Sequence, residues 1–72
     1  MKGGEKMALS DNMRRLRESR GITTMQLAEE VGVTQSLITR IEMGSRIPNV
    51  VTALAIAKRL GVTVERLVNG EE

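Results

Sequence analysis

The chain has 72 residues, so we expect one domain and no separate catalytic or small-molecule effector domain. It contains neither cysteine nor histidine, which excludes disulfides, zinc fingers, thiol nucleophiles and Ser-His catalysis within it. Phe, Tyr and Trp are also absent, which argues against RNA-binding modules that stack bases on aromatic rings. The net charge of +2 is typical of a surface of mixed charge and does not identify a partner.

Residues 1–8 carry two adjacent glycines and charges of both signs, without a periodic apolar pattern. We predict a flexible N-terminal arm over residues 1–8 and a single helical domain over residues 9–70. No apolar run approaches the roughly 20 residues that span a bilayer, and none follows the first charges as in a signal peptide. We therefore expect a cytoplasmic protein with no membrane contact.

The pattern Gly, then Ile or Val, then Thr occurs three times, at residues 21–23, 32–34 and 61–63. Glycine adopts the left-handed conformation that ends a helix, and threonine caps the start of the next one. The apolar residue between them packs onto the fourth residue of that next helix. These fourth residues are all apolar, namely Leu27, Ile38 and Leu67. The pattern predicts three helix-to-helix corners, and Thr23 with Gln26 also forms a capping box.

A fourth corner is indicated by Gly44, which follows the third helix, and by Pro48-Asn49, which opens the fourth with Asn49 as its N-cap. No segment alternates between apolar and polar residues as a strand does. The sequence therefore predicts an all-α fold of five helices, at about residues 10–20, 24–31, 35–43, 50–60 and 64–68.

Apolar residues recur at helical spacing, and we expect these stripes to form the core. The stripes are Leu9, Met13 and Leu16 in the first helix, Leu27, Ala28 and Val31 in the second, and Val50, Ala53, Leu54, Ala57 and Leu60 in the fourth. The five methionines are interpreted as flexible core fillers and caps, not as a metal or partner site.

The second and third helices are joined by a short link centred on Gly32, and such a link holds two helices at a steep angle, as in a helix-turn-helix. With Ile38 and Ile41 inward, the third helix exposes Gln35, Ser36, Thr39 and Arg40. No carboxylate lies between Val31 and Ile41. Glutamine can pair with adenine and arginine with guanine in the major groove, so this helix has the chemistry for reading bases. An ordinary solvated polar face is the alternative, which the tight turn disfavours.

From Leu9 to Leu67 the chain resembles the Cro/cI-type helix-turn-helix family, also called the xenobiotic-response-element family. The matching residues are Leu16, Arg17, Arg20, Gly21, the stretch 23–32 with Leu27 and Ala28, Val33, Thr34, Gln35, Ile38, Ile41, Glu42, Gly44, Pro48, Leu60, Gly61, Val62 and Leu67. The resemblance implies a compact five-helix, lambda-repressor-like DNA-binding domain whose helix-turn-helix is formed by helices two and three.

By position, the resemblance implies a set of DNA contacts. Base contacts would come from Gln35, Ser36 and Arg40, with Thr39 as a further candidate. Phosphate contacts would come from Thr24, at the start of the second helix, and from Arg46, in the loop after the third.

The resemblance also implies an ion pair between Arg17 and Glu42 that links the first helix to the end of the third. Its role would be structural, and two independent surface charges are the alternative. Two features depart from the family pattern, over three positions. Many relatives place Gln or Ser at the positions of Thr24 and Met25, and Met43 replaces a commonly polar residue.

Together these features predict a sequence-specific transcriptional regulator that binds double-stranded DNA, has no cofactor or metal, and acts on the nucleoid. We expect a repressor that occludes a promoter as a homodimer on an inverted-repeat operator. We place the dimer contact at residues 62–68, because Val64, Leu67 and Val68 offer more apolar surface than one small core needs.

Other functions remain open. An antitoxin and a controller of a restriction-modification operon share this fold, and a protein-interaction module could use it without DNA. A gel shift against random duplexes would separate the last from the others. An enzyme is not predicted, because the adjacent carboxylates at 29–30 and 71–72 have no base, nucleophile or ligand cluster beside them.

Overall fold

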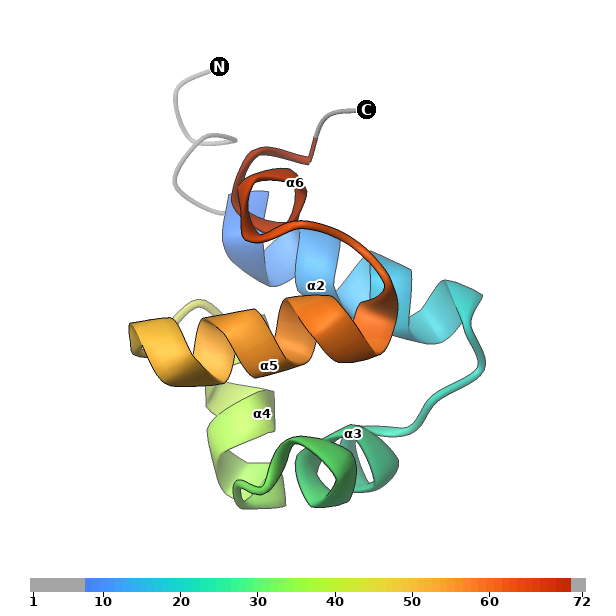
Figure 1. Ribbon diagram of the computed structural model, residues 1–72. Helices are drawn as coiled ribbons and strands as arrows, with labels where there is room; N and C mark the ends of the chain where they lie inside the picture. Colours follow the sequence, from blue (N-terminus) through green and yellow to red (C-terminus); the bar gives the residue numbers. More distant parts are fainter. Residues whose placement is uncertain (1–7, 71–72) are drawn as a thin grey trace.

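The computed structural model describes residues 8–70, which form five α-helices (Figure 1). These are α2 (Ala8–Ser19), α3 (Thr24–Val31), α4 (Gln35–Glu42), α5 (Val50–Leu60) and α6 (Val64–Asn69). The described range contains no strand, so the predicted all-α class is confirmed, and each boundary lies within two residues of its predicted place. The predicted arm lies outside the described residues except for Ala8, which begins α2. No helix between residues 8 and 70 is long and apolar enough to cross a membrane.

The predicted helix caps are present. Thr23, Thr34 and Thr63 each accept a hydrogen bond from the backbone N–H three residues later, and Asn49 caps α5 in the same way. The Gln26 side chain accepts a bond from the Thr23 backbone N–H at 2.9 Å, which completes the capping box. Local sequence therefore determines where α3, α4, α5 and α6 begin.

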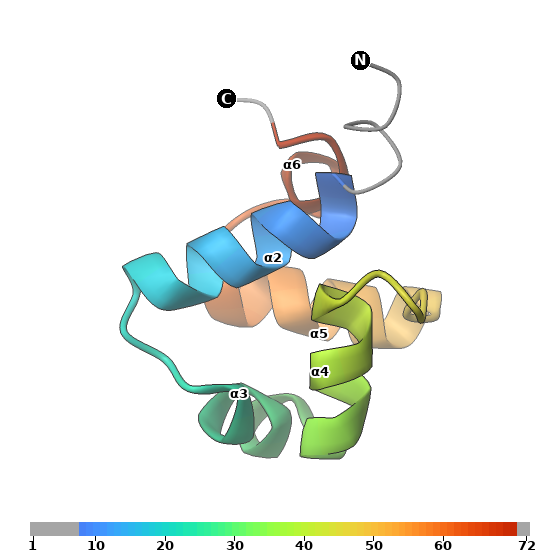
Figure 2. The ribbon, with the colours of Figure 1, turned by 180° about the vertical axis from the view of Figure 1, so that it is seen from behind.

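The core lies around α5, which crosses the middle of the molecule (Figure 1). In two opposite views α3 and α4 lie at one end and α2 and α6 at the other (Figure 2). Every helix contributes at least one fully buried aliphatic side chain; these are Met13, Leu27, Ile38, Ile41, Ile56, Leu60 and Leu67. Burying one such side chain contributes about 1.5–3 kcal/mol, so a core without aromatic residues can hold the five helices together.

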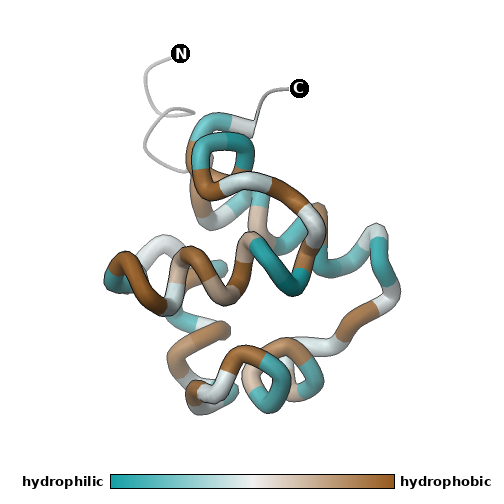
Figure 3. The backbone as a smooth tube through the Cα atoms, in the orientation of Figure 1, coloured by the Kyte–Doolittle hydropathy of each residue, from teal (hydrophilic) through white to brown (hydrophobic). Residues whose placement is uncertain are grey.

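The buried side of α5 differs from the predicted stripe. Ala57 and Leu60 are buried as predicted, and Ile56 joins them. The sequence places Val50 and Leu54 in the core, but they expose 73% and 55% of their surface, so this prediction is wrong. The reason is tertiary: the N-terminal half of α5 projects at the edge of the molecule, and its hydrophobic residues are visible there (Figure 3).

The methionines also divide between two environments. Met13 is fully buried in the core, as a flexible filler would be. Met25 and Met43 are exposed, so neither is a core filler. Met43 is instead the C-cap of α4, whereas the interpretation is wrong for Met25.

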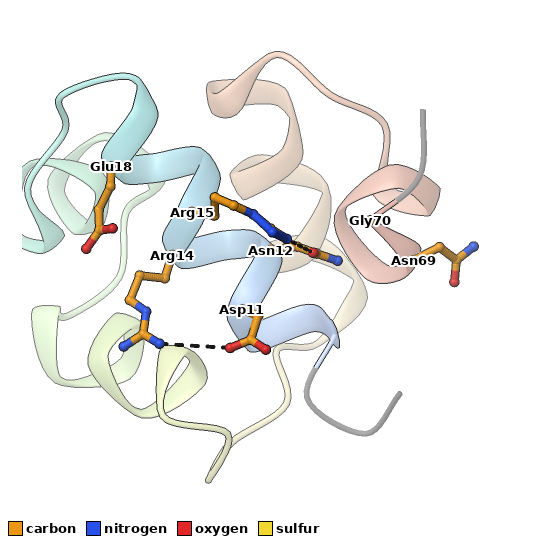
Figure 4. A pocket seen from close by; sticks show the side chains of 7 residues that line it. All are labelled: Asp11, Asn12, Arg14, Arg15, Glu18, Asn69 and Gly70. Carbon is orange, nitrogen blue, oxygen red and sulfur yellow. Dashed lines mark hydrogen bonds and ion pairs between the residues drawn. The ribbon is translucent and has the colours of Figure 1, made fainter. Parts of the chain in front are cut away.

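A polar hollow of about 570 Å³ lies between α2 and the end of α6 (Figure 4). The buried Asn12 donates through Nδ2 to the Leu67 carbonyl at 3.0 Å and accepts from Arg15 Nη2 at 2.7 Å. Gly70 lies against the same amide, and a Cβ there would come within 2.6 Å of its oxygen. The polar groups of Asn12 therefore tie α6 to α2, at the end of the molecule opposite α3 and α4.

Candidate nucleic-acid interface

The turn between α3 and α4 is closed by two backbone hydrogen bonds. The N–H groups of Gly32 and Val33 both donate to the Ala28 carbonyl, at 2.8 and 3.0 Å. Gly32 has the positive φ that the sequence predicts, at 88°. An L-residue in this conformation places its Cβ too close to the carbonyl oxygen, so glycine suits the position. The two bonds and the buried Ala28 hold the helices close together.

Helix α4 buries one side and leaves a polar side outside. Ile38 and Ile41 are almost completely buried, and all four predicted base contacts are exposed. We call this set the reading face; it consists of Gln35, Ser36, Thr39 and Arg40. The structure thus brings these four residues together on the solvent side of one short helix.

The single acidic residue of α4 is removed from solvent and neutralised. Glu42 is buried and accepts two hydrogen bonds from Arg17, from Nε to Oε2 at 2.6 Å and from Nη2 to Oε1 at 3.0 Å. Arg17 Nη1 also donates to the Ile22 carbonyl at 2.7 Å, which joins α2 to the chain before α3. The hydrogen bond with Glu42 raises the pKa of Arg17 above its usual value, against the opposing effect of burial. The pair therefore anchors α4 and leaves its exposed side without negative charge.

Thr24 and Gln35 lie in contact across the turn. Gln35 Nε2 donates to Thr24 Oγ1 at 2.9 Å, which joins a predicted phosphate contact to a predicted base contact. Neither α3 nor α4 has an acidic residue in its first turn. Arg46, the other predicted phosphate contact, is exposed in the loop between α4 and α5.

Two arginines join helices through contacts that the sequence did not predict. Arg20 Nε donates to the Leu60 carbonyl at 2.7 Å, which places a cation at the C-terminal end of α5. Arg59 on α5 forms an ion pair with Glu30 on α3. These partners are 40 and 29 residues apart, so no local pattern signals them.

The predicted dimer segment provides less surface than the sequence indicates. Leu67 is fully buried, and Val62 and Val64 pack against the core. Val68 is the exposed apolar side chain of this segment, with 42% of its surface accessible to solvent. The reason is that α6 packs along α2 and so uses its apolar side to close the core.

Comparison with known proteins identifies the domain. The helix-turn-helix family model HTH_3 matches residues 13–67. The HTH-type transcriptional activator BcrR of Enterococcus faecalis is 33% identical over 66 residues, covering 92% of this chain and 32% of that protein. The uncharacterized HTH-type transcriptional regulator YqaE of Bacillus subtilis is 32% identical over 62 residues, covering 86% and 53%. The chain thus spans a third to a half of these two relatives.

Solved structures have the same fold. The clp gene regulator ClgR from Corynebacterium glutamicum superposes with a TM-score of 0.82 at 23% identity, covering 89% of this chain and 68% of that one. The restriction-modification controller protein C.AhdI from Aeromonas hydrophila superposes with a TM-score of 0.81 at 25% identity, covering 89% and 97%. The family match covers the capped corners, the tight turn and the reading face in one continuous stretch. The chain therefore belongs to the HTH_3 family of helix-turn-helix domains, the Cro/cI type that its motifs resemble.

Proposed function

We propose that this chain is a sequence-specific transcriptional regulator that inserts α4 into the major groove of double-stranded DNA. The observation that carries the proposal is the reading face, which is polar, free of carboxylates and held at a fixed angle by the turn at Gly32. A major groove admits one α-helix, and its base edges bind side chains of these types. The names of the relatives, which are HTH-type transcriptional regulators, support the same function.

Gln35 is suited to read adenine. Its Nε2 carries two hydrogens, of which one is donated to Thr24. The second hydrogen and the Oε1 acceptor remain available, and these are the two groups that pair with adenine N7 and N6. The contact with Thr24 fixes the amide before DNA arrives, so we expect Thr24 to sharpen the preference for adenine at one operator position.

Arg40 is suited to read guanine through its two-pronged guanidinium, while Ser36 and Thr39 provide shorter hydroxyl contacts. Phosphate contacts come from Thr24 and Arg46, aided by the backbone N–H groups at the start of α3. Because the first turn of α3 has no acidic residue, nothing on it repels a phosphate there.

The proposed mechanism is occlusion of a promoter by two copies bound to an inverted repeat. One helix of eight residues covers few base pairs, and pairing two copies adds their contacts by raising the effective concentration. Repression is the simplest action of a domain that covers its site, although BcrR is an activator by name. C.AhdI supports a second candidate, a restriction-modification controller, because this fold covers 97% of that chain. An antitoxin and a protein-interaction module without DNA are the remaining alternatives.

Selection of duplexes from a random pool, followed by sequencing and footprinting, tests the proposal. We expect an inverted repeat whose half-sites lie about 10–10.5 base pairs apart, the separation of successive major grooves. Recovery of no sequence above background, with no gel shift on random duplexes, would instead favour the protein-interaction module.

Three alanine variants then assign the contacts. Arg40→Ala should relax one operator position by about 1–3 kcal/mol, and Arg46→Ala should weaken all sequences alike and lower the salt slope by about one. Lys58→Ala is the matched control, because Lys58 is an exposed cation in the last turn of α5 and belongs to none of the predicted DNA contacts. An Arg40→Ala protein with unchanged sequence preference would show that the reading face is wrongly assigned.

A further inference from the structure

A hollow of about 330 Å³ opens between the first turn of α2, the end of α4 with its following loop, and α6. We call it the apolar hollow, because four aliphatic side chains line it, namely Leu9, Ile41, Ile47 and Val68. Ile41 is buried in the core, whereas Ile47 and Val68 expose 81% and 42% of their surface. Ligand pockets have volumes of about 300–1,000 Å³ and mostly apolar walls, so this hollow can hold one small molecule.

The charge of the lining is positive. Ser10, Gly44 and Arg46 complete the lining, and Arg46 is the one charged side chain among these seven residues. Arg46 is exposed, and no carboxylate of the described residues forms an ion pair with it. An anionic head group would therefore find a cation to pair with, and an aliphatic body would cover the exposed parts of Ile47 and Val68.

Arg46 also connects the apolar hollow with the proposed DNA contacts. It is one of the two side chains to which we assign a phosphate contact, and its value there lies in its positive charge. A carboxylate held against the guanidinium neutralises that charge and repels a phosphate nearby. Occupancy of the hollow by an anion and binding of the DNA backbone by Arg46 therefore oppose each other.

We propose that the apolar hollow binds a small aliphatic carboxylic acid, whose carboxylate pairs with Arg46 and whose chain packs on the four aliphatic side chains. The bound acid lowers the affinity of the protein for DNA, and DNA lowers the affinity for the acid by the same factor. This coupling to DNA rests on the proposed function, whereas occupancy of the hollow does not.

Titration of the DNA-free chain with octanoate, 1-octanol and octylammonium tests the site, because these probes share an eight-carbon chain and differ in the charge of the head group. Methyl resonances in NMR spectra report on Leu9, Ile41, Ile47 and Val68. We expect octanoate to shift these resonances saturably with a Kd between about 10 μM and about 1 mM, the range open to so few atoms. Octylammonium should bind most weakly, because its charge has the same sign as Arg46.

Three variants separate the head group from the aliphatic chain. Arg46→Ala should weaken octanoate about fivefold and leave 1-octanol unchanged, since only the ion pair is lost. Ile47→Asp should weaken octanoate about tenfold or more, because it places a carboxylate in the wall. Val51→Asp is the matched control, because Val51 is 76% exposed on α5 and does not line the hollow. Both aspartate variants replace exposed side chains, so their melting temperatures should match the wild type.

Two results would overturn the site. One is the absence of saturable shifts, or shifts that octylammonium produces equally well and that persist in Arg46→Ala. The other is a set of shifts that follows the protein concentration in the absence of octanoate, since a second copy of the chain would then cover the hollow.

A duplex with one half-site tests the coupling and keeps the two proposals distinguishable. Saturating octanoate should lower the salt slope of wild-type binding by about one, to the slope of Arg46→Ala, and should leave the slope of Arg46→Ala itself unchanged. Sodium chloride at the same concentration is the control. An occupied hollow with unchanged DNA affinity would refute the coupling. A chain that binds octanoate but no DNA would reject the proposed function and leave the site standing.

Discussion

Helices α4 and α5 bury one side in the same core but present opposite chemistry to the solvent. The exposed side of α4 carries glutamine, serine, threonine and arginine, whereas the first half of α5 exposes two valines and a leucine. Water can form hydrogen bonds with the polar side chains of α4. It forms none with the valine and leucine side chains of α5. The comparison teaches that the core explains only one side of each helix, and we propose that the other side of α4 meets base edges.

The largest expected effect concerns the anchor of α4. Glu42→Ala removes both hydrogen bonds that the buried Arg17 guanidinium makes to a carboxylate and leaves only the exposed Glu18 at 3.8 Å, so we expect a loss of about 3–5 kcal/mol in the free energy of unfolding. Urea denaturation measures it. Glu29→Ala, at an exposed carboxylate on α3, is the control and should change stability by less than about 0.5 kcal/mol.

A double-mutant cycle of Arg17→Ala with Glu42→Ala separates this pair from two independent charges. We expect the double variant to lose much less than the sum of the two single losses, because each single variant takes away the buried partner of a buried charge. Additive losses would contradict the role given to the pair.

Two positions on α5 test the comparison within one helix. Ile56→Ala removes a fully buried side chain and should cost about 2–5 kcal/mol. Leu54→Ala removes an exposed one and should cost less than about 0.5 kcal/mol in dilute protein. Thermal or urea unfolding at low concentration measures both, and equal losses would mean that the first half of α5 is covered within one copy.

The turn that aims α4 is expected to be moderately sensitive. At Gly32 an added Cβ meets no atom within 4 Å, so the cost of substitution is backbone strain at φ 88° rather than a clash. Gly32→Ala should lose about 1–2 kcal/mol, Gly32→Val more and Gly32→Asn less, because asparagine tolerates this conformation best. An unchanged melting temperature in Gly32→Val would refute the turn geometry.

The smallest effect on stability is expected on the reading face. Ser36→Ala and Thr39→Ala remove exposed hydroxyls, so unfolding should change by less than about 0.5 kcal/mol. Any loss in operator binding would then come from lost contacts with DNA. A large loss of stability in either variant would assign these residues to the fold.

The amino-acid sequence by itself determined the corners of this protein. The glycine-to-threonine pattern, the capping box and Asn49 act through hydrogen bonds within three or four residues, so the helix bounds and the exposed polar side of α4 could be predicted from local chemistry. The predicted base contacts came from the exposed side of that helix, and the predicted phosphate contacts at Thr24 and Arg46 came from the family resemblance.

Only the tertiary structure decided which apolar residues are buried. Helical spacing places Val50, Leu54 and Leu60 in one apolar stripe of α5. Burial of each residue depends on which other helices pack against it. The first half of α5 extends past the other helices, so its apolar side chains stay exposed. The contacts of Arg20 with Leu60 and of Gln35 with Thr24 likewise join segments that only folding brings together. Local hydrogen bonds determine where the helices begin and end, while their packing, a long-range property, determines which apolar side chains stay exposed.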